Sequence, residues 1–255
     1  MRQKMTRARL FVLAAVFTLT ACTQEAEPPE DRFVCRFEHS GSDPTSCGLE
    51  SGFSDDEPGM HHAGMHHGMA MYEIDRYHGQ EATPEQKQAA EDLIRRSYES
   101  AERNGWFDFE KGSADGYKRL HRDPIHYVNK EYIFDDHVLD PERPEYLMYY
   151  NTSQGPKLVA FMFVPQKPQD EGPQIGGPLT RWHYHRWSKL YCLLEGMMTV
   201  GHAKDGQCEE GIPTKQSPEM MHVWLLDTPF GPFGKEMDLP LGLVEKLVKQ
   251  REENR

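Results

Sequence analysis

A stretch rich in histidine and methionine, residues 59–71, is the densest set of potential metal ligands in the chain. Gly-Met-His-His-Ala is followed at once by Gly-Met-His-His-Gly, and eight of the twelve residues from 60 to 71 are His or Met. Imidazole binds copper, zinc and nickel, whereas thioether selects for soft Cu(I). The ligands in this stretch are Met60, His61, His62, Met65, His66, His67, Met69 and Met71.

The glycines of this stretch give the backbone the freedom to wrap its own side chains around an ion. The stretch resembles the Met/His-rich segments of periplasmic copper-handling proteins. That resemblance implies copper as the bound ion and a copper-handling protein as a partner. Zinc or another divalent transition metal remains an alternative ion, and a polar linker without a physiological metal role remains an alternative reading.

A second group of histidines lies in the sequence Thr-Arg-Trp-His-Tyr-His-Arg-Trp, residues 180–187. In an extended segment, His183 and His185 project from one face about 6.8 Å apart along the strand. His222, on a further expected strand, supplies a third imidazole. Three nitrogen ligands with an open position are used by copper and zinc proteins. The alternative is an aromatic cluster in which the histidines satisfy hydrogen bonds, formed by Trp182, Tyr184, Trp187 and Trp224.

The residues from His183 to Gly196 resemble the first motif of cupins, in which His-x-His leads into a strand ending in glycine. Residues 218–222, Pro-Glu-Met-Met-His, resemble the cupin motif that carries the third histidine, one residue short and without its glycine. The resemblance implies a β-barrel that holds a metal through His183, His185 and His222. It departs from the family at Lys189, which stands where cupins usually place a metal-binding glutamate.

Further candidate ligands are His126 and His202. Met220 and Met221 precede His222 in the sequence, and either thioether offers a soft fourth ligand. Paired methionines in a strand are more often part of a core.

Two function classes remain. The sequence contains no Gly-x-Ser-x-Gly, no phosphate-binding glycine loop, no Cys-x-x-Cys and no His-Glu-x-x-His. We expect a metal-binding protein that captures, stores or delivers copper. The alternative is a cupin-like metalloenzyme, an oxidoreductase or hydrolase using the three histidines, which Lys189 disfavours because iron sites usually want an oxygen ligand.

The N-terminus is typical of an exported lipoprotein. Four basic residues precede the short uncharged run Leu10–Leu19, which is about half the length needed to span a bilayer. Leu19-Thr20-Ala21-Cys22 resembles the lipobox of bacterial lipoproteins. The resemblance implies cleavage after residue 21, lipid on Cys22, and, with Thr23 following, an outer-membrane anchor facing the periplasm.

Composition agrees with an envelope protein. Removing residues 1–21 takes away four basic and no acidic residues, so the net charge changes from -12 to -16 and nucleic acid is excluded as a partner. The other four cysteines suggest two disulfides in an oxidising compartment. These cysteines are Cys35, Cys47, Cys192 and Cys208. The simplest of the three possible connectivities pairs each cysteine with its sequence neighbour. In the alternative interpretation, Cys192 is a thiolate ligand of a metal ion.

The chain divides into a signal peptide (1–21), a flexible tether (22–78) and one folded domain (79–255). The tether carries too few aliphatic residues to form a core. In the domain we expect a helix after Thr83, hairpins at 147–164 and 190–201, a strand at 220–226 and a helix from Asp238. The predicted class is α+β, an antiparallel sheet or barrel flanked by an N-terminal and a C-terminal helix.

Overall fold

The long helix α2 (Pro84–Arg103) begins where the sequence predicts. The Thr83 hydroxyl accepts the Gln86 N–H, and the Gln86 side chain accepts the Thr83 N–H. This reciprocal capping satisfies two donors that the first helical turn leaves open. The helix ends at Asn104, and Gly105 adopts a φ of 71°, a conformation that favours glycine.

The structure is a computed structural model that describes residues 69–120 and 123–254.

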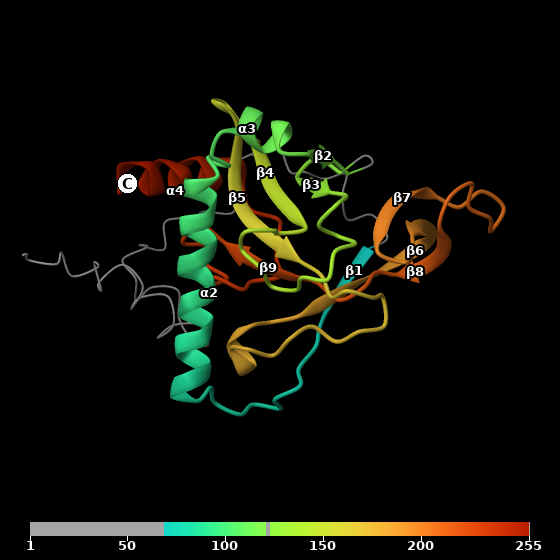
Figure 1. Cartoon of the computed structure of the whole chain (residues 1–255), viewed down its shortest axis with the longest axis horizontal. Helices are drawn as coiled ribbons and strands as arrows, with labels where there is room; N and C mark the ends of the chain where they lie inside the picture. The colour runs from blue at the N-terminus through green and yellow to red at the C-terminus, as the bar shows by residue number, and fades with distance from the viewer. Residues whose placement is uncertain (1–68, 121–122, 255) are drawn as a thin grey trace, which may run out of the picture.

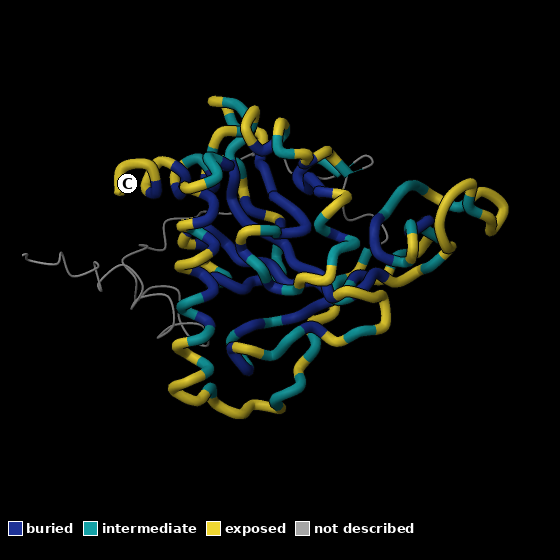
Figure 2. Tube along the Cα trace, in the orientation of Figure 1, coloured by how far each residue is buried: buried dark blue, intermediate teal, exposed yellow. Residues whose placement is uncertain are grey.

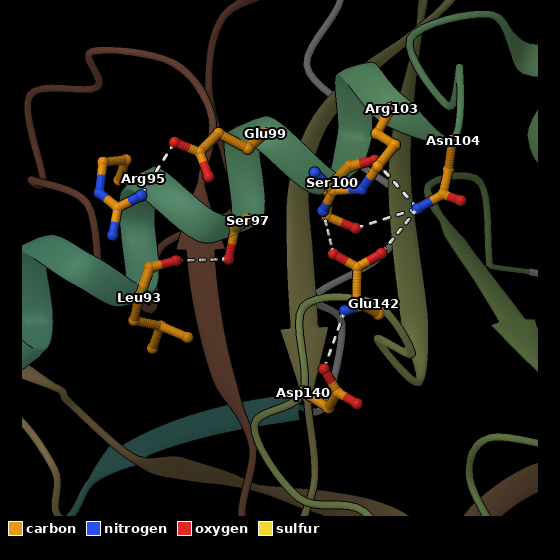
Figure 3. Close-up of polar contacts among 9 residues, drawn as sticks. All are labelled: Leu93, Arg95, Ser97, Glu99, Ser100, Arg103, Asn104, Asp140 and Glu142. Atoms are coloured by element: carbon orange, nitrogen blue, oxygen red, sulfur yellow. Dashed lines mark hydrogen bonds and ion pairs between the residues drawn. The ribbon is translucent and has the colours of Figure 1, made fainter. Parts of the chain in front are cut away.

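The C-terminal turn of α2 is fixed to the loop before the first long strand. Arg103 and the Asn104 side-chain amide both donate to the carboxylate of Glu142 (Figure 3). Inside the helix, the buried Ser97 hydroxyl donates to the carbonyl of Leu93 at 2.8 Å. The contacts with Glu142 join the C-terminal end of α2 to this loop.

Two antiparallel sheets follow from the alternating apolar strands (Figure 1). The first has the order β2-β3-β4-β5-β9, and the second has the order β1-β6-β7 with β8 also paired to β6. Among the residues that the structure describes, neither sheet closes into a barrel. The strands of the first are β2 (Tyr117–Arg119), β3 (His126–Asn129), β4 (Tyr146–Thr152), β5 (Gly155–Phe163) and β9 (Met221–Trp224), and those of the second are β1 (Met69–Glu73), β6 (His183–Leu194), β7 (Met198–His202) and β8 (Ile212–Gln216).

The five-stranded sheet is buried on both faces (Figure 2). Leu147, Phe161 and Val223 point to the face covered by α2, where Leu93 and Ile94 pack on them. The alternate residues point to a second cluster. That cluster includes Met148, Met162 and Trp224 and receives the apolar side of α4 (Leu241–Glu253), formed by Leu243, Val244, Leu247 and Val248.

The strands β6, β7 and β8 form an arm that extends from the rest of the molecule (Figure 1). Its hairpin turns at Glu195 and Gly196, both with positive φ, as their sequence predicts. A disulfide joins Cys192 to Cys208, sixteen residues later. This is the neighbour pairing expected for these two cysteines, and it excludes Cys192 as a thiolate ligand in this state. Cys22, Cys35 and Cys47 lie outside the described residues.

The expected α+β class with flanking helices is confirmed, and several details differ. Residues 69–73 were expected in the tether but form β1, because their backbone pairs with the edge of β6 in antiparallel orientation. Helix α4 begins after Pro240 rather than at Asp238. The short elements α3 (Phe109–Ala114), β2, β3, β8 and the turn of 3-10 helix Gly177–Leu179 were not expected. In the described part of the chain, no helix has the length and apolar character needed to cross a membrane.

Candidate metal centre

His183 and His185 are held on β6 by backbone contacts to the chain that leads into β9. His183 exchanges two backbone hydrogen bonds with Met220, at 2.9 and 2.8 Å. The His185 N–H donates to the Ser217 hydroxyl at 2.8 Å. Both side chains are buried, and the alternation expected for an extended segment places them on one face.

His222 comes from β9 with one ring nitrogen already engaged. Its Nδ1 lies 3.2 Å from the carbonyl oxygen of Gly234, which also accepts the Trp224 indole N–H. A carbonyl only accepts, so Nδ1 of a neutral His222 carries the proton and Nε2 carries the free lone pair. The buried Nε2 has no hydrogen-bond partner.

His126 completes the group from β3 and was only a secondary candidate in the sequence. Its Nδ1 lies 2.8 Å from Oδ2 of Asp123, whose Oδ1 accepts the backbone N–H groups of Ile125 and His126. Here too the buried Nε2 has no partner. A carboxylate that fixes one imidazole nitrogen while the other remains available is the usual outer support of a metal-binding histidine. The Asp-x-x-His spacing was the available sequence signal.

The four imidazole rings gather in one place from three strands. Ring centroids are 4.7 Å apart for His183 and His222, 5.5 Å for His183 and His185, and 6.3 Å for His126 and His222. The exposed fraction of these residues is between 0% and 7%. The site therefore brings together all three histidines expected from the sequence and adds His126.

Burial favours the neutral form of two of these imidazoles, His183 and His222. Burial lowers the pKa of His222 to about 3, with the neighbouring rings of His126 and His185 acting in the same direction. Burial also lowers the pKa of His183, helped by His222 and His185. Burial alone would raise the pKa of Asp123, but its interactions with the His126 ring and with the backbone N–H groups of Ile125 and His126 lower it to about 2. Neutral imidazole is the form that binds metals.

The hydrogen-bond alternative does not describe His183. Both of its ring nitrogens are buried without a hydrogen-bond partner. The aromatic cluster proposed as the alternative is also divided, since Trp182 packs in the core beneath α2, Trp224 belongs to the other core, and Tyr184 stacks on Tyr72. Each unsatisfied buried nitrogen costs about 1–3 kcal/mol, which a ligand at the centre would offset.

The ring positions are not those of a finished coordination shell. Among residues 69–120 and 123–254, no group of three or more His, Cys, Asp or Glu side chains has the spacing to hold one ion. His183 can turn about its terminal torsion without breaking a hydrogen bond, because neither of its ring nitrogens has a partner. The same rotation of His126 or His222 would break the contact at Nδ1. Binding at this cluster therefore requires side-chain rotation.

Charged groups beside the centre are paired with one another. Lys235 forms ion pairs with Glu73 at 3.2 Å and Glu236 at 3.0 Å, and Arg181 lies 3.7 Å from Glu73. Glu73 is the β1 partner of His183. Nearby carboxylates thus balance the cations that would otherwise repel a metal ion.

The remaining candidates fall into three groups. Met60, His61, His62, Met65, His66 and His67 lie outside the described residues. Met69 and Met71 belong to β1 and are partly buried. The ring centroids of His202 and Tyr191 lie 4.2 Å apart with the rings tilted by 42°. Lys189, at the position of the cupin glutamate, is exposed on β6.

No protein-family model matches the chain, and no curated protein or solved structure matches it. We therefore infer function from the residues of the site.

Proposed function

We propose that this chain is an envelope-anchored metal-binding lipoprotein whose folded domain holds a transition-metal ion among His126, His183, His185 and His222. The observation that carries the proposal is the pair His126 and His222. Each has its Nδ1 fixed by an oxygen and its buried Nε2 unpartnered. This is the orientation that metal-ligating histidines require.

Copper is the proposed ion, and the Met/His-rich segment is its capture site in the envelope. Imidazole suits copper, and methionine adds preference for its reduced form. The lipid on Cys22 keeps the protein at the membrane surface, and captured copper is stored there or passed to a copper-handling partner.

Binding is favoured over catalysis by the depth of the histidines. His183 and His222 are both 0% exposed, so a substrate could reach an ion between them only after the surrounding side chains move. An enzyme of the cupin type would also use a carboxylate ligand, and Lys189 at that position points to solvent. Cupin-like metalloenzyme activity is therefore the weaker proposal.

Metal analysis of the full chain tests the function. The protein is purified without an affinity tag from cells supplied with copper and zinc together, and its metals are quantified. The proposal expects copper bound at one or more ions per chain. Protein that contains no transition metal, and takes up none when reconstituted, would contradict it.

A further inference from the structure

A methionine stands directly opposite each of the four histidines in the strand pairs. These are cross-strand partners, defined by their Cα positions, and no such coincidence was expected from the sequence. The pairs are His126 with Met148, His183 with Met220, His185 with Met71, and His222 with Met162.

Residues directly opposite in an antiparallel pair project from the same face, with Cβ atoms about 4.5–5.5 Å apart. The four thioethers therefore share the side of the sheets that carries the imidazoles. Met148, Met162 and Met220 are buried and belong to one core cluster. Met71, on the edge strand β1, is partly buried.

Methionine is concentrated on this side of the fold. The core cluster that contains Met148 and Met162 has six methionines, whereas the cluster beneath α2 has one, Met221. Leucine or phenylalanine fills the corresponding positions of the same strands on the α2 side, as at Leu147 and Phe161. Packing alone does not require this separation, because leucine and methionine have similar volumes.

We infer that the centre is a mixed imidazole–thioether site selective for Cu(I), in which Met148 and Met162 supply sulfur beside His126 and His222. The inference rests on the proposed metal-binding function and extends it, because it assigns the choice of copper over zinc to the folded domain. Thioether sulfur is a ligand for Cu(I), whereas zinc sites use imidazole, thiolate and carboxylate.

The test uses the full chain with Met60, His61, His62, Met65, His66 and His67 replaced by serine, so that binding reports on the folded domain. Met148→Leu and Met162→Leu are introduced together. The matched control is Met221→Leu, because Met221 is buried next to His222 but faces α2. Cu(I) and Zn(II) affinities are measured by competition with chelators.

We expect the double variant to lose Cu(I) affinity by about tenfold or more while Zn(II) affinity stays unchanged. The control should alter neither affinity. An unchanged ratio of Cu(I) to Zn(II) affinity in the double variant would overturn the inference and leave metal binding intact. Absence of any metal binding by the serine-substituted chain would overturn the function of the folded domain itself.

A second measurement does not depend on how well the Met148→Leu and Met162→Leu variants fold. The serine-substituted chain is produced with selenomethionine, loaded with Cu(I), and studied by copper X-ray absorption. Selenium scattering in the copper shell supports the thioether ligands. A shell that contains only nitrogen neighbours contradicts them.

Discussion

The imidazole rings of His183 and His222 lie 4.7 Å apart, although they come from strands in different sheets. The two histidines are brought together by the backbone bridge between His183 and Met220, the residue just before β9. This bridge joins the two sheets at the point where the histidines gather. We propose that a metal ion binds between these histidines.

Asp123→Asn should weaken metal binding without unfolding the protein. The substitution keeps an oxygen near Nδ1 of His126 but removes the negative charge that orients and strengthens this ligand. We expect a loss of about 10- to 100-fold in metal affinity, measured by chelator competition. Asp136→Asn, at an exposed position, is the control. Equal affinities for the two variants would remove His126 from the ligand set.

The double variant Cys192→Ser, Cys208→Ser should lower the free energy of unfolding by about 3 kcal/mol. The disulfide closes a loop of sixteen residues in the arm, away from the end of β6 that carries His183 and His185. Urea unfolding of the variant measures the loss. Metal stoichiometry should remain that of the wild type, and its loss would mean that the arm supports the centre directly.

In the Glu145→Gln variant, the free energy of unfolding should decrease less with rising pH than it does in the wild type. Burial raises the pKa of this carboxyl well above its usual value, so the folded state holds the proton more tightly than the unfolded state. Its contribution is fully present below the unfolded pKa and is lost as the pH rises through the folded pKa, by about 1.4 kcal/mol per pH unit.

The measurement for Glu145 is urea unfolding of both proteins between about pH 5 and about pH 9. Wild-type stability should fall more steeply than that of Glu145→Gln as the pH rises from the unfolded pKa toward the folded pKa. Parallel curves would show that the Glu145 carboxyl has the same pKa in both states.

Cys22→Ser should move the protein from the membrane fraction to the soluble fraction. The proposed anchor is the lipid on this cysteine, and the surface charge of the mature chain gives no attraction to an anionic membrane. Fractionation after a salt wash measures the shift. Retention of the variant in the membrane would rule out lipid on Cys22 as the anchor.

Much of the fold was predictable because its signals are local. The capping residues at Thr83 and Gln86 and the apolar period of α2 depend on near neighbours in the chain. The turn at Glu195 and Gly196 needs only residues that tolerate positive φ. Such elements were placed within a few residues of their observed bounds.

The site was less predictable because it depends on pairing between distant strands. His183 and His185 were identified by their spacing. His126 joins them only because its ring lies 6.3 Å from that of His222, although β3 and β9 are not neighbours in the five-stranded sheet. Met71 was assigned to a flexible segment, since nothing near it in the sequence shows that β1 pairs with β6. The methionine opposite each histidine is a property of register, which a single sequence does not specify.

The most direct measurement is a Cu(I) titration of the full chain with its Met/His-rich segment inactivated by serine at the six ligand positions from Met60 to His67. A deletion of residues 59–71 is unsuitable because it would remove part of β1. We expect this protein still to bind at least one Cu(I), and we expect the further substitution His183→Ala to abolish this binding. Adding His137→Ala, an exposed histidine, should not. Retention of the ion after His183→Ala, or its absence before it, would contradict a metal centre in the folded domain.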